Sequence, residues 1–85
     1  MFLERNIPTL DLHGMDCEIT RILVKEFVHD NYKLGNVHIA IVHGKGQGIL
    51  KKTVHEVLKK EREVNDYYLD FFNIGCTFVE LKRKN

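Results

Sequence analysis

The chain has 85 residues, a formal net charge of +1, and hydrophobic and charged fractions of 44% and 29%. These values are typical of one small soluble globular domain and exclude a disordered chain, and the near-zero charge means that nucleic-acid binding would need a local basic patch. The longest nearly apolar run, residues 37–42, is far shorter than the ~20 residues of a membrane-spanning helix, and the N-terminus lacks the apolar core of a signal peptide. We therefore expect a cytoplasmic protein with no membrane contact. Cys17 and Cys76 are not spaced as Cys-x-x-Cys and are expected to be reduced structural thiols.

The first part of the chain predicts a strand followed by an amphipathic helix. Residues 7–12 carry alternating apolar side chains, and Pro8 stands near the start, where a strand tolerates it. After Gly14 the period changes to that of a helix, with Asp16 as its N-cap and the loop 31–36 at its end. The expected apolar stripe of this helix is Ile19, Ile22, Leu23 and Phe27.

The rest of the chain predicts a strand, a helix and a final pair of strands. Residues 37–42 are β-branched and apolar, as expected of a central strand covered on both faces. A helix over 49–62 follows, and strands over 67–72 and 77–81 are joined by a hairpin turn at 73–75. The order is βαβαββ, and the right-handed crossover rule makes the first two strands parallel if they share a sheet. The expected stripe of the second helix is Leu50, Val54, Val57 and Leu58.

Polar residues gather at the two strand-to-helix turns, over residues 10–14 and 43–48. Parallel strands bring their carboxyl ends to one edge of a sheet, where ligands bind in open α/β folds. The side chains expected to share a cleft at this edge are Asp11, His13, His43 and Lys45.

The two histidines are candidate catalytic groups. Imidazole exchanges protons near neutral pH, so His13 and His43 suit general acid or base roles. For His13 the alternative is a structural role in capping the helix or holding the turn. Asp11 could orient a histidine or help to hold a divalent cation such as magnesium, or it could only bond within the turn. A zinc site is not favoured, because only these three residues could converge as ligands.

The second turn has the features of a phosphate-binding loop. Gly44, Gly46 and Gly48 allow a close backbone approach, and N–H groups ahead of a helix favour an anion. Lys45 would stabilise the charge of a transition state. The alternative is an ordinary tight turn, and the segment lacks the full pattern of a nucleotide triphosphatase loop.

Basic and aromatic side chains offer further contacts. Lys51 and Lys52, nearest the glycine loop, are predicted to bind phosphates, with a solvated helix face as the alternative. Aromatic residues that alternate in a strand usually belong to the core, and base stacking is the alternative for Tyr67, Tyr68, Phe71 and Phe72. Three other histidines are interpreted as structural or surface residues: His29, His38 and His55.

Three motifs together carry a family resemblance. Residues 10–14 read Leu-Asp-Leu-His-Gly, residues 42–46 read Val-His-Gly-Lys-Gly, and residues 75–81 read Gly-Cys-Thr-Phe-Val-Glu-Leu. In this order the chain resembles the Smr (small MutS-related) domain over nearly its whole length. The resemblance implies an α/β two-layer sandwich with a mixed four-stranded sheet and two main helices, similar to the C-terminal domain of translation initiation factor three.

The resemblance also implies the domain limits and one departure. It gives a single domain over 1–85, with an N-terminal arm at 1–6 and a basic tail at 82–85. The family has adjacent glycines in the loop before its final strand, whereas here residues 72–74 are Phe, Asn and Ile, and only Gly75 is kept. This predicts a stiffer and bulkier loop.

The function implied by the resemblance is nucleic-acid binding. Family members are described as DNA-nicking endonucleases or endoribonucleases, some linked to ribosome quality control. We therefore expect an endonuclease that uses His13 and His43, with RNA favoured over DNA because its 2′-hydroxyl is an internal nucleophile, whereas DNA cleavage more often needs a divalent ion. The alternative is a non-catalytic module that binds structured nucleic acid or the ribosome. A third reading is a protein-interaction domain that uses the edge strand of the hairpin.

Overall fold

The predicted order βαβαββ is confirmed by a computed structural model that describes residues 7–46 and 48–84. The expected N-terminal arm, residues 1–6, lies outside the described residues, as does the last residue of the basic tail. The elements are β1 (Thr9–Asp11), α1 (Cys17–Leu34), β2 (His38–Val42), α2 (Ile49–Lys60), β3 (Val64–Leu69) and β4 (Cys76–Leu81).

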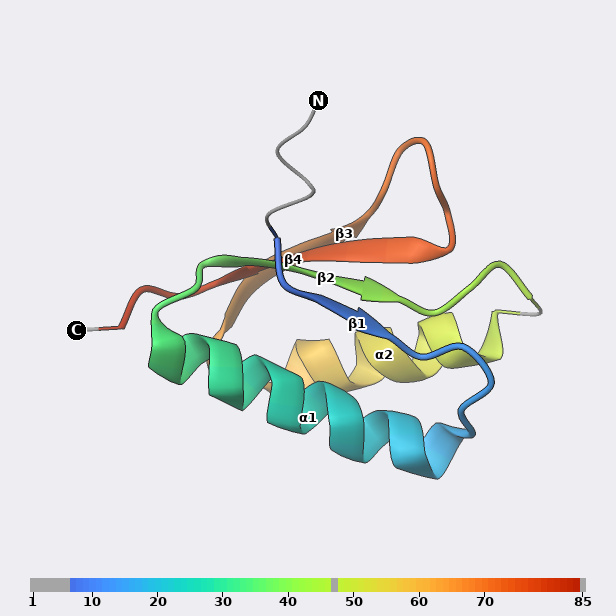
Figure 1. Cartoon of the computed structure of the whole chain (residues 1–85), viewed down its shortest axis with the longest axis horizontal. Coiled ribbons are helices and arrows are strands. Elements are labelled where there is room, and N and C mark those ends of the chain that lie inside the picture. Colours follow the sequence, from blue (N-terminus) through green and yellow to red (C-terminus); the bar gives the residue numbers. More distant parts are fainter. Residues whose placement is uncertain (1–6, 47, 85) are drawn as a thin grey trace.

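The strands form one mixed sheet in the order β1-β2-β4-β3. β1 and β2 are parallel, as predicted, and β4 is antiparallel to both β2 and β3. β2 is central and its middle residues are buried, but both helices lie on the same side of the sheet (Figure 1), so among the described residues no helix covers its other face. Two helices that pack on each other form a single layer, which covers one face. Neither described helix is long and apolar enough to cross a membrane.

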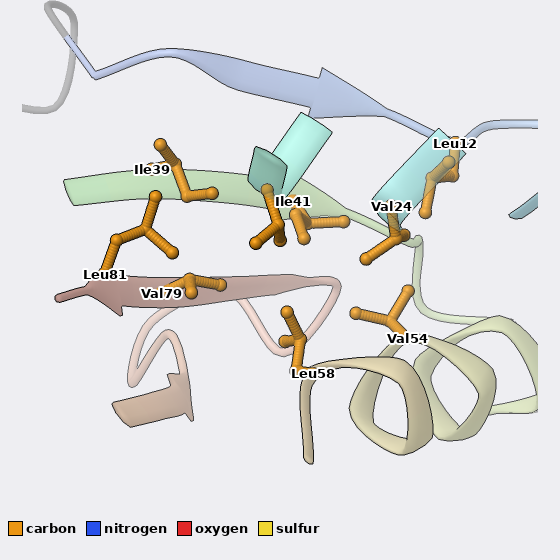
Figure 2. Packing of buried hydrophobic residues seen from close by; sticks show 9 residues of the cluster. Leu12, Val24, Ile39, Ile41, Val54, Leu58, Val79 and Leu81 are labelled. Carbon is orange, nitrogen blue, oxygen red and sulfur yellow. The ribbon is translucent and has the colours of Figure 1, made fainter. Parts of the chain in front are cut away.

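The hydrophobic core lies between the sheet and the helix layer (Figure 2). Full burial of one such aliphatic side chain contributes about 1.5–3 kcal/mol to folding. Both helices and three of the four strands, or the residues just after them, supply the core: Leu12, Val24, Val28, Ile39, Ile41, Val54, Leu58, Val79 and Leu81.

The ends of α1 follow from local chemistry. The carboxylate of Asp16 accepts a hydrogen bond from the N–H of Ile19 at 2.8 Å, which confirms the predicted N-cap. The helix continues to Leu34, four residues into the expected loop, and ends at Gly35. Gly35 has a φ of 84°, a left-handed conformation that glycine adopts without a steric penalty, and its N–H bonds to the last helical carbonyls.

The predicted apolar stripe of α1 is confirmed at Leu23 and Phe27, which pack against the core, and wrong at Ile19 and Ile22. Ile19 and Ile22 are 44% and 57% exposed, and the buried positions are Thr20, Val24, Val28 and Asn31. Asn31 is tolerated inside because its amide donates to the carbonyl of Phe27 at 2.9 Å and accepts from Asn36 at 2.8 Å. The smaller β-branched side chains therefore face the sheet. On α2 the prediction is confirmed, with Val54 and Leu58 buried and Leu50 and Val57 packed against the core.

The hairpin differs from its prediction at β3. This strand covers Val64–Leu69 rather than 67–72, because the carboxylate of Asp70 accepts the N–H of Phe72 at 2.9 Å and turns the chain away. Phe71 and Phe72 are therefore 89% and 91% exposed, and the expectation that they belong to the core is wrong. Tyr67, in contrast, packs against the core.

Candidate functional site

Three connections meet at one end of the sheet: the β1–α1 turn, the β2–α2 loop and the β3–β4 loop (Figure 1). The N–H of Leu12 donates to the carbonyl of Val42 at 2.8 Å, which joins the first turn to the end of β2. The carbonyl of Gly75 accepts the N–H groups of His43 and Gly44, both at 2.9 Å, which joins the third connection to the second. The two polar turns therefore lie at the same edge, as the sequence predicts.

Gly75 packs closely against the glycine loop. A Cβ at this position would lie 3.1 Å from the carbonyl carbon of Gly44 and 3.1 Å from Cγ of Lys45. These distances are tighter than ordinary van der Waals contacts, so a side chain here would crowd the glycine loop, which favours glycine at this position.

His43 is buried, with 5% of its surface exposed, and both of its ring nitrogens have partners. Nδ1 lies 3.1 Å from the carbonyl of Gly44, and Nε2 lies 2.8 Å from the hydroxyl of Thr77. Because a carbonyl only accepts, Nδ1 carries the proton, and Nε2 of the neutral ring accepts from the Thr77 hydroxyl.

The same hydroxyl reaches a second histidine. Nε2 of His55 lies 2.8 Å from the Thr77 oxygen, and since the hydroxyl proton is already donated to His43, His55 is the donor. The His55 ring also lies 5.0 Å from that of Tyr67, centroid to centroid. We call the series His55, Thr77 and His43 the histidine–threonine chain.

Both histidines of this chain are neutral at pH 7. Burial lowers the pKa of His43, and the nearby Lys51 lowers it further, against the opposing effect of the hydrogen bond to Gly44. Burial also lowers the pKa of His55, as do the charges of His43 and Lys51. The acceptor role of His43 Nε2 requires a neutral ring, which agrees with its lowered pKa, whereas the donor role of His55 is open to either charge state.

Sequence reasoning missed His55 and Thr77. His55 was interpreted as a structural or surface residue because it belongs to none of the three motifs, although it lies one helical turn after Lys51. Thr77 belongs to the third motif, two residues after Gly75, and its side chain is fully buried between the sheet and α2. Its contacts with the two histidines could not be predicted, because β4 and α2 are brought together only by tertiary packing.

A small pocket of about 140 Å³ opens at the start of α2. Gly48 precedes the helix with a φ of 81° and has no side chain to cap it, in contrast to Asp16 at α1. The first turn contains no acidic residue, so its N–H groups favour an anion. The residues that line the pocket are His43, Gly44, Gly46, Gly48, Ile49, Leu50 and Lys51.

Of the predicted phosphate contacts, Lys45 and Lys52 do not line this pocket, and both are exposed. Lys45 stands next to it on the glycine loop and Lys52 on the first turn of α2. Lys51 is half-buried and lines the pocket. Lys51 is therefore the lysine closest to a bound anion, with Lys45 at the rim.

Asp11 and His13 lie outside the pocket and are exposed, with 66% and 84% of their side chains accessible. The Asp11 carboxylate accepts the N–H of His13 at 2.9 Å and lies 3.9 Å from its Nδ1. Asp11 is in register with Val42, so its side chain projects to the face opposite His43. The expectation of one cleft containing all four residues is wrong, because alternation along the strands separates them.

Among the described residues, the group that could act together as metal ligands lies elsewhere, at His29, Glu61 and Glu63. Nδ1 of His29 lies 3.0 Å from Glu63 and Nε2 lies 3.7 Å from Glu61, so the imidazole lies between the two carboxylates. This cluster joins the C-terminal half of α1 to the segment that follows α2. It is not part of the pocket at the glycine loop.

A family model described as the Smr domain matches residues 10–82. The chain belongs to the Smr domain family. It is 36% identical over 72 residues to the endonuclease MutS2 of Clostridium perfringens (strain SM101 / Type A), which covers 85% of this chain and 9% of that protein. It is 39% identical over 83 residues to the endonuclease MutS2 of Clostridium botulinum (strain ATCC 19397 / Type A), covering 94% and 10%. The chain thus spans about a tenth of the length of these relatives.

Solved Smr structures share the fold. The Smr domain of Thermus thermophilus MutS2 superposes with a TM-score of 0.86 at 24% identity, covering 89% of this chain and 99% of that one. YdaL, a stand-alone small MutS-related protein from Escherichia coli, gives 0.84 at 24% identity, covering 88% and 64%. The predicted α/β fold with a mixed four-stranded sheet and two helices is confirmed.

Proposed function

We propose that this Smr domain binds nucleic acid at the glycine loop and cleaves a phosphodiester bond there. The observation that carries the proposal is the pocket at the start of α2, where uncapped helical N–H groups, glycine backbone and Lys51 converge. A backbone phosphate fits this chemistry, because amides donate hydrogen bonds to its oxygens and the lysine supplies positive charge. Lys45 and Lys52 extend the positive charge along the rim.

The roles of the two motif histidines differ in this proposal. His13 is exposed and its ring is free to meet a substrate, so we assign proton transfer to it, with Asp11 holding its turn. His43 has partners on both nitrogens, and a substrate would have to displace Gly44 or Thr77 to reach them. We therefore assign to His43 a positioning role, in which its hydrogen bonds to Gly44 and Thr77 hold the glycine loop in place.

RNA is the favoured substrate. Its 2′-hydroxyl is an internal nucleophile, which suits a site whose reactive groups are an imidazole and lysines, whereas DNA cleavage would need an external water. The second carboxylate oxygen of Asp11 could help to hold magnesium together with substrate oxygens, since magnesium is commonly bound by one or two carboxylates and phosphates.

Cleavage assays test this proposal. The purified chain would be incubated with end-labelled structured RNA and with supercoiled DNA, in magnesium or chelator, beside the variants His13→Ala and His43→Ala. We expect RNA products that His13→Ala abolishes without loss of binding, whereas His43→Ala lowers both cleavage and binding. The matched control is His38→Ala, which removes an exposed histidine from β2 and should change nothing. Unchanged cleavage in both motif variants would refute the catalytic assignment.

A second candidate is a non-catalytic module that binds structured nucleic acid or the ribosome in the cytoplasm. The engaged nitrogens of His43 favour it, because they leave the described part of the pocket without a free imidazole. In that case Lys45→Ala weakens binding and no variant or wild-type sample yields a cleavage product.

A further inference from the structure

Two aromatic side chains stand exposed at the tip of the β3–β4 loop. Phe71 and Phe72 are 89% and 91% exposed, and their ring centroids lie 5.3 Å apart with the planes at 86°. Tyr68 and Ile74 on either side are also more than half exposed. Apolar groups gathered in this way on a small domain mark a surface that another molecule covers.

The tip is held in place by its own polar residues. The carboxylate of Asp70 accepts the N–H of Phe72 at 2.9 Å. The side-chain oxygen of Asn73 accepts a hydrogen bond from the N–H of Gly75 at 3.0 Å. The backbone carbonyl of Asn73 accepts another from the N–H of Cys76, also at 3.0 Å. The two phenyl rings are therefore presented on a hydrogen-bonded turn that does not use them for packing in the core.

The tip is also joined to the candidate phosphate pocket. The Gly75 carbonyl binds the N–H groups of His43 and Gly44, and the stem of Lys45 lies against Gly75. Figure 1 shows the β3–β4 loop and the β2–α2 loop at the same end of the molecule. A strand whose phosphate lies at the glycine loop therefore has its neighbouring nucleotides beside the aromatic tip.

We propose that Phe71 and Phe72 stack on unpaired bases of the bound strand, so that the domain prefers single-stranded over duplex segments. This inference rests on the function proposed above, and it specifies the substrate. Stacking on aromatic side chains is available to every base, but only where the base is not already enclosed in a duplex. The positive charge of Lys45, whose stem lies against Gly75, and of Lys51 in the adjoining pocket favours a polyanion as the occupant over an apolar protein segment.

Fluorescence measurements test the proposal directly. The chain contains no tryptophan, so Phe72→Trp introduces a single reporter at the tip. We expect its emission to be quenched by a 12-nucleotide single-stranded RNA, and much less by the same RNA in a duplex or by a 12-unit abasic backbone. Binding of the labelled RNA would be followed in parallel by anisotropy for Phe71→Ala, Phe72→Ala and Lys45→Ala.

The aromatic variants should weaken single-strand binding by about 5- to 140-fold for each base that loses its stacking partner, and should leave duplex binding unchanged. The matched control is Leu34→Ala, which removes an exposed apolar side chain from the end of α1, outside the proposed surface, and should have no effect. If Lys45→Ala weakens binding but the aromatic variants do not, the stacking proposal fails and phosphate binding stands. If wild-type protein binds none of these probes, both proposals fail.

Discussion

The hydroxyl of Thr77 lies 2.8 Å from Nε2 of His43, at the base of the glycine loop. Because the same oxygen also meets His55, one buried hydroxyl satisfies two imidazoles. Thr77→Val keeps the shape of the side chain but leaves both nitrogens without a partner. We expect a loss of about 1–3 kcal/mol in the free energy of unfolding, measured by urea denaturation. Thr77→Ser retains the hydroxyl and should lose clearly less, and equal losses in the two variants would contradict this account of the chain.

Stability should fall in mild acid. Burial lowers the pKa of both His43 and His55 in the folded state, so the unfolded chain binds protons more readily. The folding contribution is therefore fully present above the ordinary histidine pKa of about 6.5, and it is lost as the pH falls through that value towards the lowered pKa values. Urea midpoints at pH 7.5 and pH 5.0 measure the difference.

The difference should shrink in His55→Gln, which keeps an N–H donor near Thr77 but cannot take up a proton. His38→Gln removes an exposed histidine and serves as the control. A pH dependence that is the same in His55→Gln as in the wild type would show that the buried pair is not its source.

The contact between Gly75 and the glycine loop predicts a pair of opposite outcomes. Gly75→Ala places a methyl group 3.1 Å from the backbone of Gly44 and from the Lys45 stem, so these neighbours must give by a few tenths of an ångström. We expect a loss of about 1–3 kcal/mol in unfolding free energy, as in other overpacked sites. Gly46→Ala has nothing within 4 Å of the added atom and should leave thermal and urea stability nearly unchanged. Similar stabilities for the two variants would rule out the close packing described here.

Much of the fold follows from local signals in the sequence. The N-cap Asp16, the apolar residues of β2 and the stripe of α2 act through short-range chemistry, and each is predicted in its place. The burial of Thr20 and Asn31 on α1 was not predictable, because both are polar residue types that are usually exposed. The larger apolar residues Ile19 and Ile22 were expected to face the core, but they are exposed.

The site was predicted only in part, because the sequence indicates where the turns lie but not which way their side chains point. The two polar turns meet at one sheet edge because parallel strands require it, but side-chain alternation then turns Asp11 away from His43. Aromatic composition suggested a strand through Phe71 and Phe72, whereas the carboxylate of Asp70 ends β3 before them. The histidine–threonine chain joins residues 22 and 34 positions apart, a separation over which no sequence period carries information.

The central claim is that nucleic-acid phosphate binds at the glycine loop, and the salt dependence of binding tests it most directly. The affinity for a single-stranded RNA would be measured across a range of salt concentrations for wild type, Lys45→Ala and Lys82→Ala. Lys82 follows β4 at the opposite end of the sheet and is exposed, so it controls for the loss of one positive charge. The account predicts weaker binding and a salt slope reduced by about 0.7 for Lys45→Ala alone, and equal effects of the two variants, or binding independent of salt, would contradict it.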